Sequence, residues 1–175
     1  MRNFKEKLTD IKAFAFDVDG VFTDSMLTIM PSGEIIRQFN AKDSMAVVHA
    51  VKKGYPIAII SGGRGEQVYK RMVELGVKHI YLLSSCKMDS LNDFAAKEEL
   101  SLSEILFVGD DYPDIEPMQS VGLSIAPRDA ADAVRAIASY TSLFEGGRGV
   151  VRDAIEQVLR ANNDWISEGE TFRAF

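Results

Sequence analysis

Residues 13–20 read Ala13-Phe14-Ala15-Phe16-Asp17-Val18-Asp19-Gly20, and they are the clearest indication of the fold class. Four apolar residues in a row, ending in acid, are typical of a strand that is buried on both faces of a parallel sheet. Similar apolar runs follow at 56–60, 80–83, 105–108 and 123–126. They alternate with helical patterns, so we predict an α/β fold with a doubly wound parallel sheet covered by helices on both faces.

The remaining elements are placed around these strands. Two extended runs, 26–30 and 34–39, flank Pro31-Ser32-Gly33 and predict a β-hairpin inserted after the first strand, at about 21–40. Asp43-Ser44 is expected to cap the first long helix, which Gly54 ends. Further helices are expected at 66–75, 88–99, 115–120, 130–138 and 151–161.

Length and composition exclude several classes of protein. A chain of 175 residues predicts one domain, 1–175, with no room for a separate cap over an active site. Its formal net charge of −6 argues against a nucleic-acid partner. The single cysteine, Cys86, cannot form an internal disulfide and is expected to be buried. The start lacks a long apolar stretch, so we expect a cytoplasmic protein without a membrane partner, with a frayed tail at about 166–175.

Chemically active residues follow the predicted strands. In open α/β sheets the site lies beyond the carboxyl ends of the strands, so we expect these residues to converge there. They are Asp17 and Asp19 after the first strand, Ser61-Gly62-Gly63-Arg64 after the second, Lys87 before a helix, and Asp110, Asp111 and Asp114 after the strand at 105–108.

The residue types in this set predict a phosphoryl-transfer site. Close carboxylates repel one another unless a cation offsets their charge, and oxygen ligands without His or Cys select Mg²⁺. The Ser61 hydroxyl, the Gly62 and Gly63 amides and the Lys87 ammonium suit a bound phosphate. A carboxylate in line with phosphorus can attack it and form an aspartyl phosphate.

The order Asp17-x-Asp19-Gly20, Ser61, Lys87 and Gly109-Asp110-Asp111-x-x-Asp114 resembles the four motifs of haloacid dehalogenase superfamily phosphohydrolases. The resemblance implies that Asp17 is the nucleophile and Asp19 the general acid and base. It implies that Ser61, Gly62 and Lys87 bind phosphate. The implied metal ligands are Asp17, the backbone carbonyl of Asp19, and Asp110, while Asp111 and Asp114 support them.

The short gaps between the motifs resemble one capless group, the phosphatases of 8-phosphorylated 3-deoxy-D-manno-octulosonate, over nearly the whole chain. This resemblance implies a sugar-acid phosphate substrate from lipopolysaccharide synthesis. It also implies a homotetramer in which hairpins form a central barrel and a neighbouring subunit covers each site. Candidate residues for binding the sugar acid are Gly63, Arg64, Lys42 and Arg71. Arg173-Ala174-Phe175 of the tail is a candidate for reaching an adjacent site.

Three alternatives stay open. The nine-carbon homologue is the substrate of a related branch that has an acid and a lysine where this chain has Gly63 and Glu74. Losing both polar groups favours the eight-carbon sugar. A response-regulator receiver shares the aspartyl phosphate chemistry, but its acidic pair comes first and its phosphorylated Asp later. A non-catalytic oligomerising relative is opposed by the complete set of motifs.

Overall fold

The computed structural model describes residues 3–166, so the predictions for the tail at 167–175 lie outside the described residues. Its main feature is a six-stranded sheet in the order β5-β4-β1-β6-β7-β8, in which every neighbouring pair is parallel. The strands are β1 Ala13–Phe16, β4 Ile57–Ile60, β5 His79–Tyr81, β6 Ile105–Val108, β7 Leu123–Ala126 and β8 Tyr140–Thr141. The predicted α/β fold with a doubly wound parallel sheet is confirmed.

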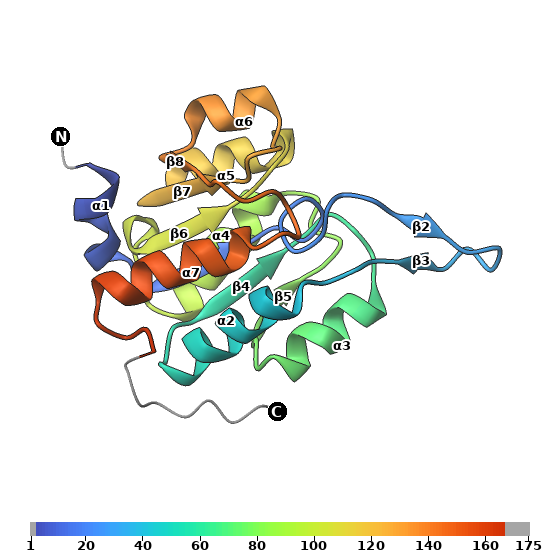
Figure 1. The fold of residues 1–175 in the computed structure, drawn as a ribbon, viewed down its shortest axis with the longest axis horizontal. Coiled ribbons are helices and arrows are strands. Elements are labelled where there is room, and N and C mark those ends of the chain that lie inside the picture. The colour runs from blue at the N-terminus through green and yellow to red at the C-terminus, as the bar shows by residue number, and fades with distance from the viewer. Residues whose placement is uncertain (1–2, 167–175) are drawn as a thin grey trace.

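Helices cover both faces of this sheet (Figure 1). Phe14 and Phe16 of β1 pack into one apolar cluster, whereas Ala13 and Ala15 pack into a second, because successive strand side chains point to opposite faces. The first cluster includes residues of α2 Ala41–Lys52, α3 Glu66–Glu74 and α7 Val150–Ala161. The second includes residues of α4 Lys87–Lys97, α5 Ile115–Ser120 and α6 Asp132–Ile137.

The hairpin is shorter than predicted. Its paired strands are β2 Thr28–Ile29 and β3 Ile35–Ile36, and they project beyond the edge of the sheet (Figure 1). The side chains of these strands are exposed and have no core to pack on. Strand pairing is therefore limited to two residues in each strand. Besides this hairpin, only α2 is a regular element between β1 and β4. The segment from β4 to β6 holds α3, β5, α4 and one 3₁₀ turn, so neither gap contains a cap domain.

The start of α2 differs from the prediction. Asn40 caps the helix by accepting a hydrogen bond from the Lys42 backbone N–H, whereas Asp43 and Ser44 lie buried inside the first turns. Asp43 instead accepts from the Arg152 backbone N–H, at the start of α7. Asp is a residue type that caps helices, but Asp43 meets the start of α7 and not the start of its own helix, because tertiary packing brings α7 close to it.

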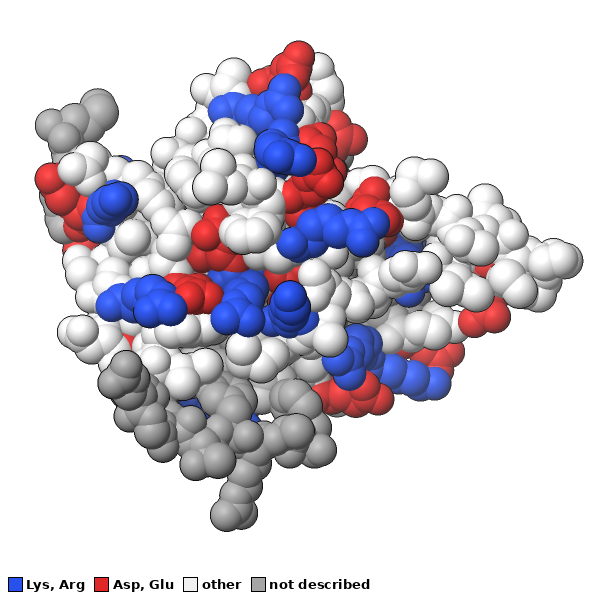
Figure 2. All heavy atoms as spheres, viewed as in Figure 1, with Lys and Arg blue, Asp and Glu red and all other residues white. Residues whose placement is uncertain are grey.

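Among the α-helices and strands, sequence patterns also missed α1 Phe4–Lys7 and the edge strand β8. Their lengths of four and two residues are too short to show a periodic pattern. Within residues 3–166, no helix combines the length and the apolar character needed to cross a bilayer. Basic and acidic side chains are interspersed on the face shown in Figure 2, which lacks the continuous basic surface of a nucleic-acid-binding protein.

Candidate active site

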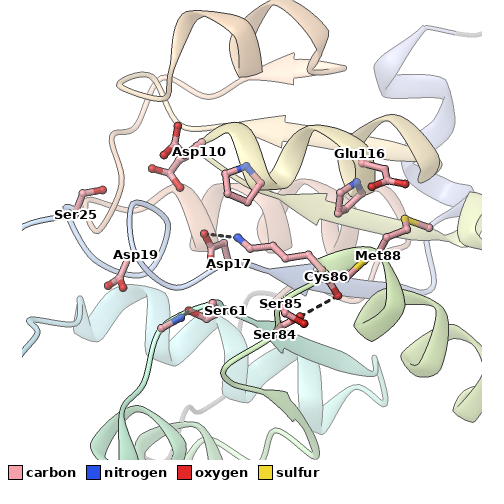
Figure 3. A pocket seen from close by; sticks show the side chains of 16 residues that line it. Asp17, Asp19, Ser25, Ser61, Ser84, Ser85, Cys86, Met88, Asp110 and Glu116 are labelled. Carbon is pink, nitrogen blue, oxygen red and sulfur yellow. Dashed lines mark hydrogen bonds and ion pairs between the residues drawn. The ribbon is translucent and has the colours of Figure 1, made fainter.

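A cavity of about 600 Å³ opens at the carboxyl edge of the sheet, where β1 lies between β4 and β6 (Figure 3). This is the switch point at which the chain moves from one side of β1 to the other, the usual place for a ligand in such sheets. Eight of the predicted site residues line it together: Asp17, Asp19, Ser61, Gly62, Gly63, Lys87, Asp110 and Asp111.

Lys87 joins two carboxylates at the base of the cavity. Its Nζ lies 2.8 Å from Asp17 Oδ2 and 2.6 Å from Asp114 Oδ1. Burial by itself would lower the pKa of Lys87, but Asp114 and Asp17 outweigh it and raise that pKa. The ammonium therefore stays charged and holds the side chain of Asp17 at the cavity wall. Asp17 is 7% exposed.

Three carboxylates meet beside this ion pair. One oxygen each from Asp17, Asp110 and Asp114 lies within 4.8 Å of the others. Burial raises the pKa of Asp17 to about 7, reinforced by Asp114 and opposed by Lys87. Burial also raises the pKa of Asp110 to about 7, reinforced by Asp17 and Asp114. This excess of negative charge, in an all-oxygen donor set, fits a hard divalent cation such as Mg²⁺.

Two glycines make the approach of these carboxylates possible. Gly20 has a φ of +85°, and a Cβ there would lie 1.9 Å from Asp110 Oδ2. A Cβ on Gly109 would lie 2.4 Å from the Cβ of Asp114. Any larger residue at either position would displace an acid of the cluster.

Asp114 organises the loop that follows β6. Its Oδ2 accepts hydrogen bonds from the backbone N–H groups of Asp110 and Asp111, at 3.1 and 3.3 Å. It is fully buried, and its other oxygen holds Lys87. Asp114 thus lies within the group of three carboxylates, and its supporting role there stays a prediction.

Ser61 and the two glycines after it form the opposite wall. Ser61 is buried at the end of β4, and its backbone N–H donates to Tyr81 of the neighbouring strand, so the sheet fixes its position. Its Oγ accepts a hydrogen bond from the Gly63 backbone N–H at 3.1 Å. In Figure 3, Ser61 and Asp19 lie on the same side of the cavity, with Asp110 across from them.

Asp19 has a partner that the sequence analysis did not identify. Arg37, one residue beyond β3, donates from Nε to Asp19 Oδ1 at 2.7 Å and from Nη2 to Asp19 Oδ2 at 2.9 Å. Its Nη1 also donates to the Arg64 carbonyl oxygen at 3.2 Å. The only available signal was a basic residue in the second extended run of the hairpin, and nothing local indicates that it contacts Asp19, 18 residues earlier in the chain.

The candidate sugar-binding residues are spread over three places. Gly63 lines the active-site cavity, and the Arg64 carbonyl contacts Arg37 nearby. Lys42 lines a separate cavity with Arg148 and Arg152, and Arg71 lies in a groove along the hairpin. The structure of one chain therefore does not bring Lys42 and Arg71 to the site.

Other residues complete the cavity wall. Cys86 is exposed and lines the cavity, so the expectation that it is buried was wrong. It occupies the position before α4, on the loop that faces the site, where no helix covers it. Ser84, Ser85 and Glu116 are polar lining residues that the strand-end pattern did not single out (Figure 3).

Known proteins resemble this chain in fold and in sequence over most of its length. Residues 79–153 match the family model of haloacid dehalogenase-like hydrolases. The chain is 33% identical, over 89% of its length and 82% of the relative's, to the 3-deoxy-D-manno-octulosonate 8-phosphate phosphatase KdsC of Escherichia coli K12.

Solved structures agree with this match. The corresponding phosphatase of Moraxella catarrhalis, solved with a magnesium ion, a phosphate ion and a KDO molecule, has a TM-score of 0.89 at 30% identity, covering 92% of each chain. The cobalt-bound form of the Haemophilus influenzae phosphatase has a TM-score of 0.86 at 27% identity, covering 90% of this chain and 92% of the other. The chain belongs to the 3-deoxy-D-manno-octulosonate 8-phosphate phosphatase family of haloacid dehalogenase-like hydrolases.

Proposed function

We propose that this chain hydrolyses 3-deoxy-D-manno-octulosonate 8-phosphate to the free sugar acid and inorganic phosphate, with Mg²⁺ as cofactor, in the synthesis of lipopolysaccharide precursors. The observation that carries the proposal is the Lys87 ion pair with Asp17 at the edge where Asp19, Ser61 and Asp110 also meet. Family membership supports the substrate, and it disfavours the receiver domain and the non-catalytic relative.

In the first step Asp17 acts as the nucleophile. One of its carboxylate oxygens attacks phosphorus, the bond between phosphorus and the C8 oxygen of the sugar breaks, and Asp19 donates a proton to that departing oxygen. The products are the free sugar acid and a phosphoryl group on Asp17. Ser61, the Gly62 amide and Lys87 bind the phosphoryl oxygens through the transfer.

In the second step Asp19 acts as the base. It accepts a proton from a water molecule whose oxygen attacks phosphorus, and the bond between phosphorus and Asp17 breaks. Inorganic phosphate leaves, and both carboxyl groups return to their starting states.

Asp17 and Asp110 would hold Mg²⁺, together with the Asp19 carbonyl, while Asp111 and Asp114 support this set. When bound, the ion offsets negative charge on the carboxylates and on the transferring phosphoryl group. Lys87 already offsets part of that charge: its ion pair favours the ionised form of Asp17, against the burial and the Asp114 charge that raise the pKa of Asp17.

Gly63 favours the eight-carbon sugar acid. A Cβ at this position would lie 3.2 Å from Arg37 Nη2 and 3.4 Å from Asp19 Oδ2. An acidic side chain here would therefore compete with Asp19 for the Arg37 guanidinium. Arg64, next along the same loop, is the proposed contact for the sugar carboxylate. Lys42 and Arg71 line other cavities, and their contact with substrate stays a prediction.

The proposal includes a homotetramer built through the hairpin. Apolar side chains stand exposed on this two-stranded projection, among them Met26 at 75% and Ile29 at 72%. The projecting end is also largely free of charged side chains in Figure 2. Exposed apolar surface of this kind marks a protein interface, and a neighbouring chain there would cover a site over which residues 3–166 place no cap domain.

We place the reaction in the cytoplasm, because a sugar phosphate carries charge that does not enter a lipid bilayer unaided. We also propose that residues 1–175 form one domain. In its support, both apolar clusters pack against the same sheet.

A specificity screen tests the proposal. Purified protein with Mg²⁺ is assayed for phosphate release from eight- and nine-carbon sugar acid phosphates, with Asp17→Asn as the control for contaminating phosphatase. We expect a higher kcat/KM for the eight-carbon substrate. A higher kcat/KM for the nine-carbon substrate would overturn the substrate assignment, and no turnover of any sugar phosphate would overturn the proposed activity.

A further inference from the structure

The Arg37 guanidinium joins the hairpin to the catalytic loops. It binds both oxygens of the Asp19 carboxylate and reaches the Arg64 carbonyl with its remaining terminal nitrogen. The Arg37 side chain is 7% exposed, so packing holds it in this one arrangement. The hydrogen bonds that Arg37 donates to Asp19 also raise the pKa of Arg37, which therefore stays charged throughout the working range of pH.

Asp19 has little else to hold it. Its side chain is 31% exposed, and its other described contact is a long hydrogen bond of 3.4 Å from the Thr23 hydroxyl. A carboxylate held by one weak contact samples several rotamers. A bidentate arginine restricts it to one, because both oxygens must match the planar guanidinium.

Resting on the proposed function, we infer that Arg37 is a positioning residue: it sets the orientation in which the Asp19 carboxyl faces the departing oxygen. Arg37 acts through Asp19 and does not itself contact the reacting atoms. Because Arg37 directly follows β3, the orientation of the Asp19 carboxyl also depends on the position of the hairpin relative to the sheet.

The leaving group separates this role from a general structural one. A sugar alkoxide is a poor leaving group and needs the proton from Asp19 as its bond to phosphorus breaks. A p-nitrophenolate ion is stable without a proton, so its departure does not need Asp19. The parameter kcat/KM covers the steps up to loss of the leaving group. Misalignment of Asp19 therefore lowers kcat/KM for the sugar phosphate and leaves that for p-nitrophenyl phosphate nearly unchanged.

The experiment compares Arg37→Gln and Arg37→Lys with the wild type on both substrates in Mg²⁺. Arg135→Gln is the matched control, since Arg135 pairs with an aspartate on α6 outside the cavity. For Arg37→Gln we expect kcat/KM on the eight-carbon sugar phosphate to fall by about 10- to 100-fold, and on p-nitrophenyl phosphate by less than about 3-fold. Arg37→Lys should recover only part of the loss, because an ammonium cannot bind both oxygens in the same plane.

Two results would overturn the inference. An equal loss on both substrates, with a raised KM, would show that Arg37 binds the substrate or supports the fold. No loss on either would show that Asp19 is positioned without it. The proposed function is judged separately by the wild type: if it rejects the sugar phosphate but hydrolyses another alkyl phosphate, the same comparison of alkyl and aryl leaving groups still tests Arg37.

Discussion

Asp43 provides a test of how α2 and α7 are joined. The residue is fully buried, and its Oδ1 accepts the Arg152 backbone N–H at 2.8 Å. Its Oδ2 is the one buried side-chain oxygen without a hydrogen-bond partner among the described residues. Burial raises the pKa of Asp43 to about 6, although the α7 backbone N–H groups and Arg152 partly oppose this. The ionised side chain therefore costs stability, and we expect Asp43→Asn to stabilise the protein at neutral pH.

The size and pH dependence follow from this pKa. It is raised from 3.8 by about two units, which corresponds to a cost of about 3 kcal/mol. The folded pKa is above the unfolded value, so the cost is complete above pH 6, falls as the pH is lowered, and vanishes below 3.8. Asp43→Asn should thus gain about 2–3 kcal/mol at pH 7.5 and about half of that at pH 5.

Urea unfolding in EDTA, followed by the fluorescence of the single tryptophan, Trp165, measures the difference at both pH values. Asp89 is the matched control, because it holds the same third position of its helix, α4, but is exposed. We expect Asp89→Asn to change stability by less than about 0.5 kcal/mol at either pH. If Asp43→Asn is no more stable than the wild type at pH 7.5, or if its gain is the same at pH 5, the reasoning is refuted.

The active site and hairpin lead to three further predictions. Lys87→Met leaves Asp17 and Asp114 facing each other without their shared cation, so the free energy of unfolding measured in urea should fall by about 3–5 kcal/mol; an unchanged value would mean that the ion pair adds nothing. Removal of Mg²⁺ with EDTA should abolish phosphate release, and adding Mg²⁺ back should raise the Tm of the wild type but raise it less in Asp110→Asn; equal shifts in both proteins would place the ion elsewhere. Ile29→Glu puts a charge on the exposed hairpin face and should give a smaller assembly by light scattering, whereas an unchanged mass would exclude this face as the interface.

Strand positions were the most predictable part of the fold. The apolar runs at 105–108 and 123–126 coincide with β6 and β7 residue for residue. Strands that are buried on both faces contain few polar residues, so their ends are easy to recognise in the sequence. The hairpin strands were overestimated, since exposed apolar residues look the same in sequence as buried ones. Asp19 and Arg37 show the same limit for the site. The acid was evident from its place after β1, but its partner was not, because no short motif records a contact between residues 18 positions apart.

The amino-acid sequence was enough to predict the sheet, the carboxyl edge where the reactive residues gather, and the residue types of the phosphoryl-transfer site. These features are local, because each depends on an apolar run and the polar residues that directly follow it. The contacts between distant groups became visible in the folded structure: Lys87 between Asp17 and Asp114, Asp43 at the start of α7, and Arg37 on Asp19. Such pairings depend on distances between separate elements, which are set when the helices and the hairpin pack around the sheet.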